Sequence, residues 1–205
     1  MSQHSPAPVT VVPAAVSDIA PAAAVLAEAF ARDTHTVGLL PSGGISRRLN
    51  TLFTRVITEA LKAGGHVYLA RQTQNPNLLG VAVWEAPGQA VTSTPVTSIP
   101  DYARVFGTRV LDAARTDRAA HRHRPSVPHW YLRAIGTVPA ARGLGVGTSL
   151  LGDRLSCADA AGVGAYLESS TPENVSYYQR FGFIERGRIP ASGTTEPIGM
   201  WRPAP

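Results

Sequence analysis

Apolar residues in the first third of the chain recur at the three- and four-residue spacing of amphipathic helices. This spacing predicts one helix over residues 18–31 and a second over residues 45–63. Short runs of strand-forming residues predict strands at residues 9–12, 66–71 and 78–85, the last two joined by a polar hairpin loop. The first part of the chain is therefore expected to fold as a strand, two helices and a hairpin.

The rest of the chain contains a long insert and then regularly alternating elements. The insert, residues 87–127, is first rich in Thr, Ser and Pro and then helical over residues 101–121. It is followed by strands at residues 130–138, 165–170, 183–188 and 197–202 and by helices that end near residues 162 and 180. The pattern predicts an α/β (α+β) fold with a helical insert between its third and fourth strands.

Size and composition favour a single domain. A chain of 205 residues that is 44% hydrophobic is long enough to bury one core. We expect residues 1–8 to be a flexible tail and residues 9–205 to form one domain. No apolar run is long enough to span a bilayer and the N-terminus lacks a signal-like apolar stretch, so no membrane partner is expected.

Charge limits the classes of partner that the chain is expected to bind, and the cysteine content indicates its cellular location. The net charge of +5 suits an anionic cofactor but is too small and dispersed to indicate nucleic acid. We interpret the basic residues of the insert (Arg115, Arg118 and residues 121–124) as a solvated face, with an acidic partner or a cofactor phosphate as alternatives. No metal site is expected, because the histidines lack ligand partners at suitable spacing. The single cysteine, Cys157, fits a cytoplasmic location, and we expect it to be buried.

A glycine-rich segment follows the fourth predicted strand: Arg142-Gly143-Leu144-Gly145-Val146-Gly147-Thr148. Glycines let the backbone approach a ligand closely, and the start of a helix offers free N–H groups to phosphate oxygens. The segment therefore predicts a pyrophosphate site for a nucleotide-bearing cofactor. Its G-x-G-x-G spacing, and residues 139–142 that separate it from the strand, disfavour the G-x-G-x-x-G fingerprint of NAD or FAD enzymes.

Two motifs resemble the signatures of the GNAT acetyltransferases. Arg142, Gly145 and Gly147 fill the Arg/Gln-x-x-Gly-x-Gly/Ala pattern of that family. About thirty residues later, the run Asn174-x-x-Tyr177-Tyr178-x-x-Phe181-Gly182-Phe183 resembles its second hallmark. The two occur in the family's order and at its separation, and the resemblance extends over roughly residues 9–202.

The resemblance implies a central mixed, mostly antiparallel sheet, flanked by helices, with a splay between the fourth and fifth strands. It also implies that acetyl-CoA binds at this splay, where backbone groups of the fourth strand hold the pantetheine arm. The residues that it assigns to acetyl-CoA are Ile135, Gly136, Thr137, Val138, Arg142, Gly143, Leu144, Gly145, Val146, Gly147, Thr148, Asn174, Tyr177 and Arg180.

Catalytic roles also follow from the resemblance. Tyr178 matches the tyrosine that protonates the departing thiolate, since a phenol with a pKa of about 10 stays protonated near neutrality. A carboxylate is expected to take the amine's proton, and the candidates are Glu168, Glu85 and Asp33. The expected acceptor pocket has an aromatic wall of Phe30, His35, Trp84, Trp130 and Tyr131. Packing in the core, or ion pairing for the carboxylates, is the alternative role for each of these residues.

The function that these features favour is acetyl-CoA-dependent N-acetylation of a small-molecule amine by a monomer or homodimer. Within the family, residues 128–132 and 166–170 resemble the puromycin N-acetyltransferase-like self-resistance enzymes, so an antibiotic such as an aminonucleoside is a plausible acceptor. A protein or peptide N-acetyltransferase and a non-catalytic acyl-CoA sensor are the alternatives. The long insert suits a covered pocket for a small acceptor better than an open peptide groove.

Overall fold

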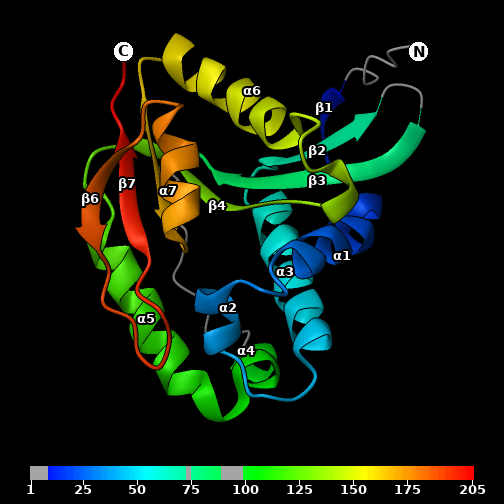
Figure 1. Cartoon of the computed structure of the whole chain (residues 1–205), viewed down its shortest axis with the longest axis vertical. Helices are drawn as coiled ribbons and strands as arrows, with labels where there is room; N and C mark the ends of the chain where they lie inside the picture. Colours follow the sequence, from blue (N-terminus) through cyan, green and yellow to red (C-terminus); the bar gives the residue numbers. More distant parts are fainter. Residues whose placement is uncertain (1–8, 73–74, 89–98) are drawn as a thin grey trace.

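A seven-stranded sheet runs through the centre of the computed structural model, which describes residues 9–72, 75–88 and 99–205 (Figure 1). The strands lie in the order β1-β2-β3-β4-β5-β7-β6. Their bounds are β1 Val9–Pro13, β2 Val67–Gln72, β3 Asn75–Glu85, β4 His129–Thr137, β5 Gly164–Ser169, β6 Ile184–Arg188 and β7 Ile198–Arg202. The mixed α/β fold expected from the sequence is confirmed, and each strand lies close to its predicted position.

Among the strands of the described residues, one neighbouring pair is parallel. β4 and β5 pair in parallel from His129 and Gly164 to Leu132 and Leu167, while every other neighbouring pair is antiparallel. β4 then continues along β3 to Thr137, whereas β5 continues along β7. The two strands therefore part after Leu132, and a gap opens in the middle of the sheet.

Helices cover both faces of the sheet (Figure 1). α1 (Ile19–Ala29) and α3 (Ile45–Lys62) pack on one face, and α6 (Val146–Ala160) packs on the other together with α7 (Pro172–Gln179). Each face buries its own apolar cluster, because alternate residues of a strand point to opposite faces. None of the helices in the described residues combines the length and the hydrophobicity that a membrane crossing needs.

The insert contains two helices rather than one over residues 101–121. α4 (Ile99–Phe106) is followed by a short 3-10 turn (Gly107–Arg109) and then by α5 (Val110–His123). Gly107 adopts a φ of +49°, which a helix interior does not accommodate, and so it ends α4. The direction of the chain changes at this residue.

A short helix that the sequence patterns did not predict precedes α3. α2 (Thr34–Gly38) begins at Asp33, whose carboxylate accepts a hydrogen bond from the amide of Thr36 at 2.7 Å. A carboxylate at this position satisfies an amide that has no partner within the helix, which is the usual reason for a helix to start there. Five residues are too few to show helical periodicity in the sequence, so the cap was the only available signal.

The prediction for the single cysteine is wrong. Cys157 is exposed, although it lies within α6 as expected. Leu155 and Ala158 of the same helix are buried against the sheet, and Cys157 lies on the outer side of the helix between them. The predicted tail, residues 1–8, lies outside the described residues.

Leu26 tests how much stability the α1 layer provides, because it is completely buried in the cluster between α1 and the sheet. We expect Leu26→Ala to lower the free energy of unfolding by about 2–5 kcal/mol, through lost apolar burial and the cavity left behind. Val16→Ala is the control, since Val16 is 76% exposed and its loss is expected to cost less than about 0.5 kcal/mol. Urea unfolding followed by circular dichroism measures both, and equal effects would contradict the assignment of Leu26 to the core.

Candidate active site

The gap between β4 and β5 joins two cavities. The first, of about 560 Å³, lies at the glycine-rich segment and is called the glycine-loop cavity. The second, of about 340 Å³, is lined by α1, α2, α3 and the helices of the insert, and is called the insert cavity. Ile135, Asn174 and Tyr178 line both cavities, so they stand at the junction.

The structure gathers most of the residues predicted to bind the cofactor around the glycine-loop cavity. Its lining includes Ile135, Gly136, Thr137, Arg142, Gly143, Gly145, Val146, Gly147, Thr148, Asn174, Tyr177 and Arg180. Two predicted residues do not line it. The side chain of Leu144 is partly exposed to solvent, and the amide of Val138 already donates to the carbonyl of Leu79 at 2.9 Å.

The glycine-rich segment leaves the start of α6 open. Gly143 and Gly145 adopt φ values of +80° and +74°, and a Cβ at either position would meet no protein atom within 4 Å. Gly145 is the N-cap of α6 and has no side chain to occupy the first amides of the helix. Arg142 and Arg180 add positive charge to the same cavity. This arrangement fits the phosphates of a nucleotide.

The exposed edge of β4 provides further hydrogen-bonding groups. Successive residues of a strand direct their backbone groups to opposite sides, and the amide of Val138 faces β3. The backbone groups of Ile135 and Thr137 at the end of β4 therefore face away from β3, toward the gap where β5 has departed. Such groups fit an extended arm that carries amides, since it can pair with the strand as another strand would.

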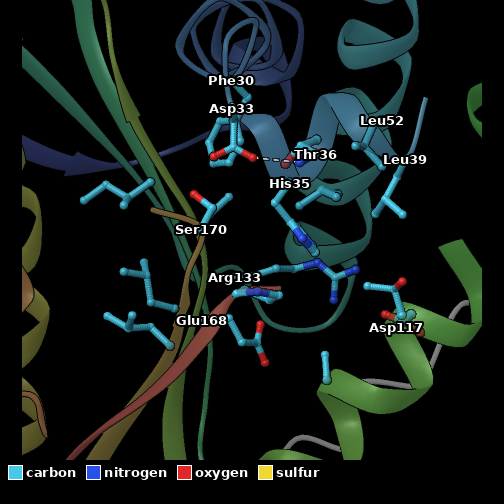
Figure 2. A pocket seen from close by; sticks show the side chains of 18 of the residues that line it. Phe30, Asp33, His35, Thr36, Leu39, Leu52, Asp117, Arg133, Glu168 and Ser170 are labelled. Carbon is cyan, nitrogen blue, oxygen red and sulfur yellow. Dashed lines mark hydrogen bonds between the residues drawn. The ribbon is translucent and has the colours of Figure 1, made fainter. Parts of the chain in front are cut away.

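The insert cavity has an apolar side and a charged side. Aromatic and aliphatic side chains of α1, α3 and α4 form the apolar side: Phe30, Leu52, Phe53, Val56, Tyr102 and Phe106. On the charged side, Arg133 and Glu168 come from the strands, His35 from α2 and Asp117 from α5 (Figure 2). The Arg133 side chain extends toward Asp117 in this view. The cavity therefore offers both an apolar surface and opposite charges.

Two of the aromatic residues predicted for the acceptor pocket lie elsewhere. Phe30, His35 and Tyr131 line the insert cavity, but Trp84 and Trp130 do not. Trp84 is 1% exposed in the cluster under α6, and the ring of Trp130 lies 4.9 Å from that of His66. Strand alternation explains both cases, because each tryptophan directly precedes a residue that faces the other side of the sheet.

The loop between β6 and β7 joins two walls of the insert cavity. The Thr194 hydroxyl donates to the carbonyl of His35 at 2.6 Å, and the His35 ring bonds to the carbonyl of Thr195 at 2.6 Å. The Ser192 hydroxyl donates to Asp112 of α5 at 2.6 Å. α2 and α5 are thereby tied to each other by a segment distant in sequence.

Tyr178 lies between the two cavities on α7. It is 8% exposed, and its ring packs against those of Tyr177 and Phe183. Burial raises the pKa of its phenol above the ordinary value, so the hydroxyl keeps its proton at every physiological pH. A protonated hydroxyl at the junction can donate a proton to a group that enters from the glycine-loop cavity.

The two glutamates predicted as alternative bases differ in their surroundings. Glu168 lines the insert cavity, whereas Glu85 does not. Both oxygens of Glu85 are taken by guanidinium groups, Arg133 at 2.8 Å and Arg124 at 3.3 Å. Glu85 therefore acts as an ion-pair partner for the two arginines.

Glu168 is better suited to accept a proton. Its Oε2 accepts a hydrogen bond from the Tyr131 hydroxyl at 2.5 Å, and its Oε1 has no hydrogen bond within the described residues. Burial raises the pKa of Glu168 above its ordinary value, while Arg124 and the Tyr131 hydroxyl oppose that shift. Asp33, the third candidate, lines the cavity but caps α2 with one oxygen.

Sequence reasoning missed several residues of the insert cavity. Arg133 is displaced by a bulge in β4, since Val83 pairs with Ala134 but Trp84 pairs with Leu132. A bulge leaves no signal in the pattern of apolar residues, so the side of the sheet that Arg133 faces was not predictable. Asp117 lies within a basic helix, and no feature of the sequence marked it as a cavity residue.

Among the described residues, no group of His, Cys, Asp and Glu could hold a metal ion.

The comparisons with known proteins place these features in a family. Residues 100–183 match the acetyltransferase (GNAT) family. A structure from Corynebacterium glutamicum, described as histone acetyltransferase HPA2 and related acetyltransferase, is 31% identical, with a TM-score of 0.77 over 96% of this chain and 97% of that one. Arylalkylamine N-acetyltransferase 7 from the mosquito Aedes aegypti shares the fold at 13% identity, with a TM-score of 0.70 over 95% of this chain and 87% of that one.

The chain therefore belongs to the GNAT family of acetyltransferases, enzymes that transfer the acetyl group of acetyl-CoA. The glycine-loop cavity fits this donor on the geometry described above. The open start of α6 suits the pyrophosphate, and the free edge of β4 suits the amides of the pantetheine arm.

Gly145 tests the role of the glycine-loop cavity. We expect Gly145→Ala to weaken acetyl-CoA binding on the order of tenfold, because its Cβ points into open space and its positive φ is strained for alanine. Gly162→Ala is a matched control, since Gly162 also has a positive φ and open space but lies beyond the other end of α6. Calorimetric titration measures both variants, and equal losses of affinity would show that the cavity is not the donor site.

Proposed function

We propose that the protein N-acetylates a small-molecule amine held in the insert cavity. The observation that carries this proposal is the position of Tyr178, which lines both the cavity that fits acetyl-CoA and the cavity opposite it. A donor and an acceptor that enter from the two sides would meet at this hydroxyl. The structure thus offers one place at which the reacting groups can be held together.

The chain's own residues can supply both proton transfers. When bound, acetyl-CoA supplies an activated acetyl thioester. Tyr178 donates its phenolic proton to the departing sulfur, which its raised pKa keeps available. Glu168 takes the proton of the attacking amine, either directly or through water, and its unbonded Oε1 is the accepting atom. The two residues lie on α7 and on β5.

The lining of the insert cavity indicates the kind of amine. Phe30, Phe53 and Tyr102 suit a flat apolar group, and Glu168 and Asp117 suit an amine that arrives as a cation. An aromatic amine, including an aminonucleoside antibiotic such as puromycin, has these features. The likeness of residues 128–132 and 166–170 to self-resistance enzymes supports the same class of acceptor.

A protein acceptor is the second candidate, because the relative from Corynebacterium glutamicum is described as a histone acetyltransferase. The insert cavity disfavours this reading for the present chain. Helices α4 and α5 line the cavity, and the loop between β6 and β7 ties α5 to α2 beside it. A peptide segment needs an extended groove, whereas the cavity between these elements, of about 340 Å³, suits a compact acceptor. A non-catalytic acyl-CoA sensor is disfavoured by the placement of Tyr178 and Glu168.

The choice of acceptor is tested with a panel of amines. We expect thiol release from acetyl-CoA, and a product heavier by one acetyl group, with an aromatic amine or puromycin but not with a lysine peptide. Aminoglycosides and polyamines complete the panel, because they carry amines without an aromatic group. Turnover of the peptide in preference to every small amine would overturn the proposal.

Tyr178→Phe tests the proposed acid. The variant keeps the ring that packs against Tyr177 and Phe183 and removes only the hydroxyl. We expect kcat to fall on the order of a hundredfold, with little change in the Kd for acetyl-CoA, since general acid catalysis contributes about that factor or more. Steady-state kinetics and calorimetry separate the two effects. Parallel losses of kcat and affinity would instead assign Tyr178 to donor binding.

A further inference from the structure

The helical insert reaches the acceptor site through a buried side chain, that of Arg124. Arg124 follows the last residue of α5, and its side chain is only 16% exposed. Its guanidinium carbon lies 3.6 Å from the centre of the Tyr131 ring, and its Nη1 donates to Glu85 at 3.3 Å. Its Nε lies 3.7 Å from Oε1 of Glu168. Arg124 therefore contacts residues of three different strands.

We propose that Arg124 is a positioning residue for the acetyl transfer, which holds Glu168 ionised and correctly oriented as the base. The insert then takes part in catalysis as well as covering the acceptor. This inference rests on the proposed role of Glu168 as base. Arg124 acts through Glu168 and is not required to touch the donor or the reacting amine.

Arg124 acts on Glu168 electrostatically. The charged and titratable groups that act on Glu168 are Arg124, Tyr131, Arg133 and Glu85, and Glu168 in turn acts on Tyr166. Burial favours the protonated carboxyl, whereas a guanidinium nearby favours the carboxylate. Arg124 is the largest of the influences that lower the pKa of Glu168. Without it, the carboxyl would hold its proton to higher pH.

Arg124 and Tyr131 together also fix the orientation of Glu168. The Tyr131 hydroxyl holds Oε2 of Glu168, and Arg124 lies over the ring that carries this hydroxyl. The distance of 3.7 Å from Nε to Oε1 is an ion-pair contact but too long for a hydrogen bond. Arg124 can thus stabilise the negative charge without occupying the lone pairs of Oε1, which a base needs for the incoming proton.

Arg124 can be replaced without leaving either carboxylate without a hydrogen bond. Glu85 keeps its bond to Arg133 at 2.8 Å, and Glu168 keeps its bond to Tyr131. Arg124→Gln removes the charge and retains a polar amide on a shorter side chain. Arg124→Lys retains the charge but lacks the planar group that lies over Tyr131. Arg122→Gln is the matched control, because Arg122 lies two residues away and is exposed.

The experiment records kcat/KM with the best amine of the panel from about pH 5 to about pH 9, a range that starts close to the ordinary pKa of a carboxyl group and extends well above it. Since the base must be deprotonated, activity falls as pH drops through its pKa. We expect Arg124→Gln to move this acid limb to higher pH. The loss of kcat/KM in this variant is expected to be on the order of tenfold at about pH 6 and much smaller at about pH 9. Arg124→Lys should recover most of the shift, and Arg122→Gln should match the unmodified protein.

If Arg124→Gln lowers kcat/KM equally at every pH and leaves the acid limb of the profile unmoved, Arg124 only supports the structure. This result would overturn the inference. Glu168→Gln, measured alongside, separates this failure from that of the base. If Glu168→Gln removes the acid limb but Arg124→Gln leaves it unmoved, the base stands and the role of Arg124 is rejected. If Glu168→Gln keeps both the activity and the limb, the base itself is wrongly assigned and the inference fails with it.

Discussion

The parting of β4 and β5 after Leu132 and Leu167 is the constraint on which the rest of the structure depends. Two strands that remained paired would satisfy each other's backbone groups, and the sheet would be closed at its centre. Because β5 follows β7 instead, the backbone groups of Ile135 and Thr137 lack a neighbouring strand on that side. The same gap brings the start of α6 and the side of α7 to one opening, which is why both cavities meet at Tyr178.

The opening is kept in place by contacts on both sides of the sheet. Gly136 lies so close to α1 that a Cβ would come 2.6 Å from that of Ala29, so α1 packs directly on the backbone of β4. Across the insert cavity, the loop between β6 and β7 bonds to α2 and α5 through the hydroxyls of Thr194 and Ser192. One wall is therefore fixed by close apolar packing and the other by polar contacts, which makes the second the easier to rearrange.

The sequence predicted the site residues that belong to local motifs. It did not predict those whose role depends on contacts between distant parts of the chain. The glycine-rich segment and the run from Asn174 to Arg180 are local motifs, and the structure places both at one cavity. Trp84 and Trp130 pack in the cluster under α6, and Glu85 and Tyr131, their neighbours in the strands, point to the other face of the sheet, as the alternation of strand residues predicts. The partners of Arg124 lie far along the chain at Glu85 and Glu168, so no local pattern could reveal them.

Two glutamates and two arginines form one cluster of charges in which the two glutamates are bound differently. Glu85, Glu168, Arg124 and Arg133 balance one another, so the cluster as a whole carries no net charge. The pairing is unequal, however, because Glu85 bonds to both arginines while Glu168 bonds to a neutral hydroxyl and lies farther from Arg124. Glu85 thus fixes the arginines in place, whereas Oε1 of Glu168 has no hydrogen-bond partner within the described residues. A carboxylate that is stabilised but not fully paired is what a general base at neutral pH requires.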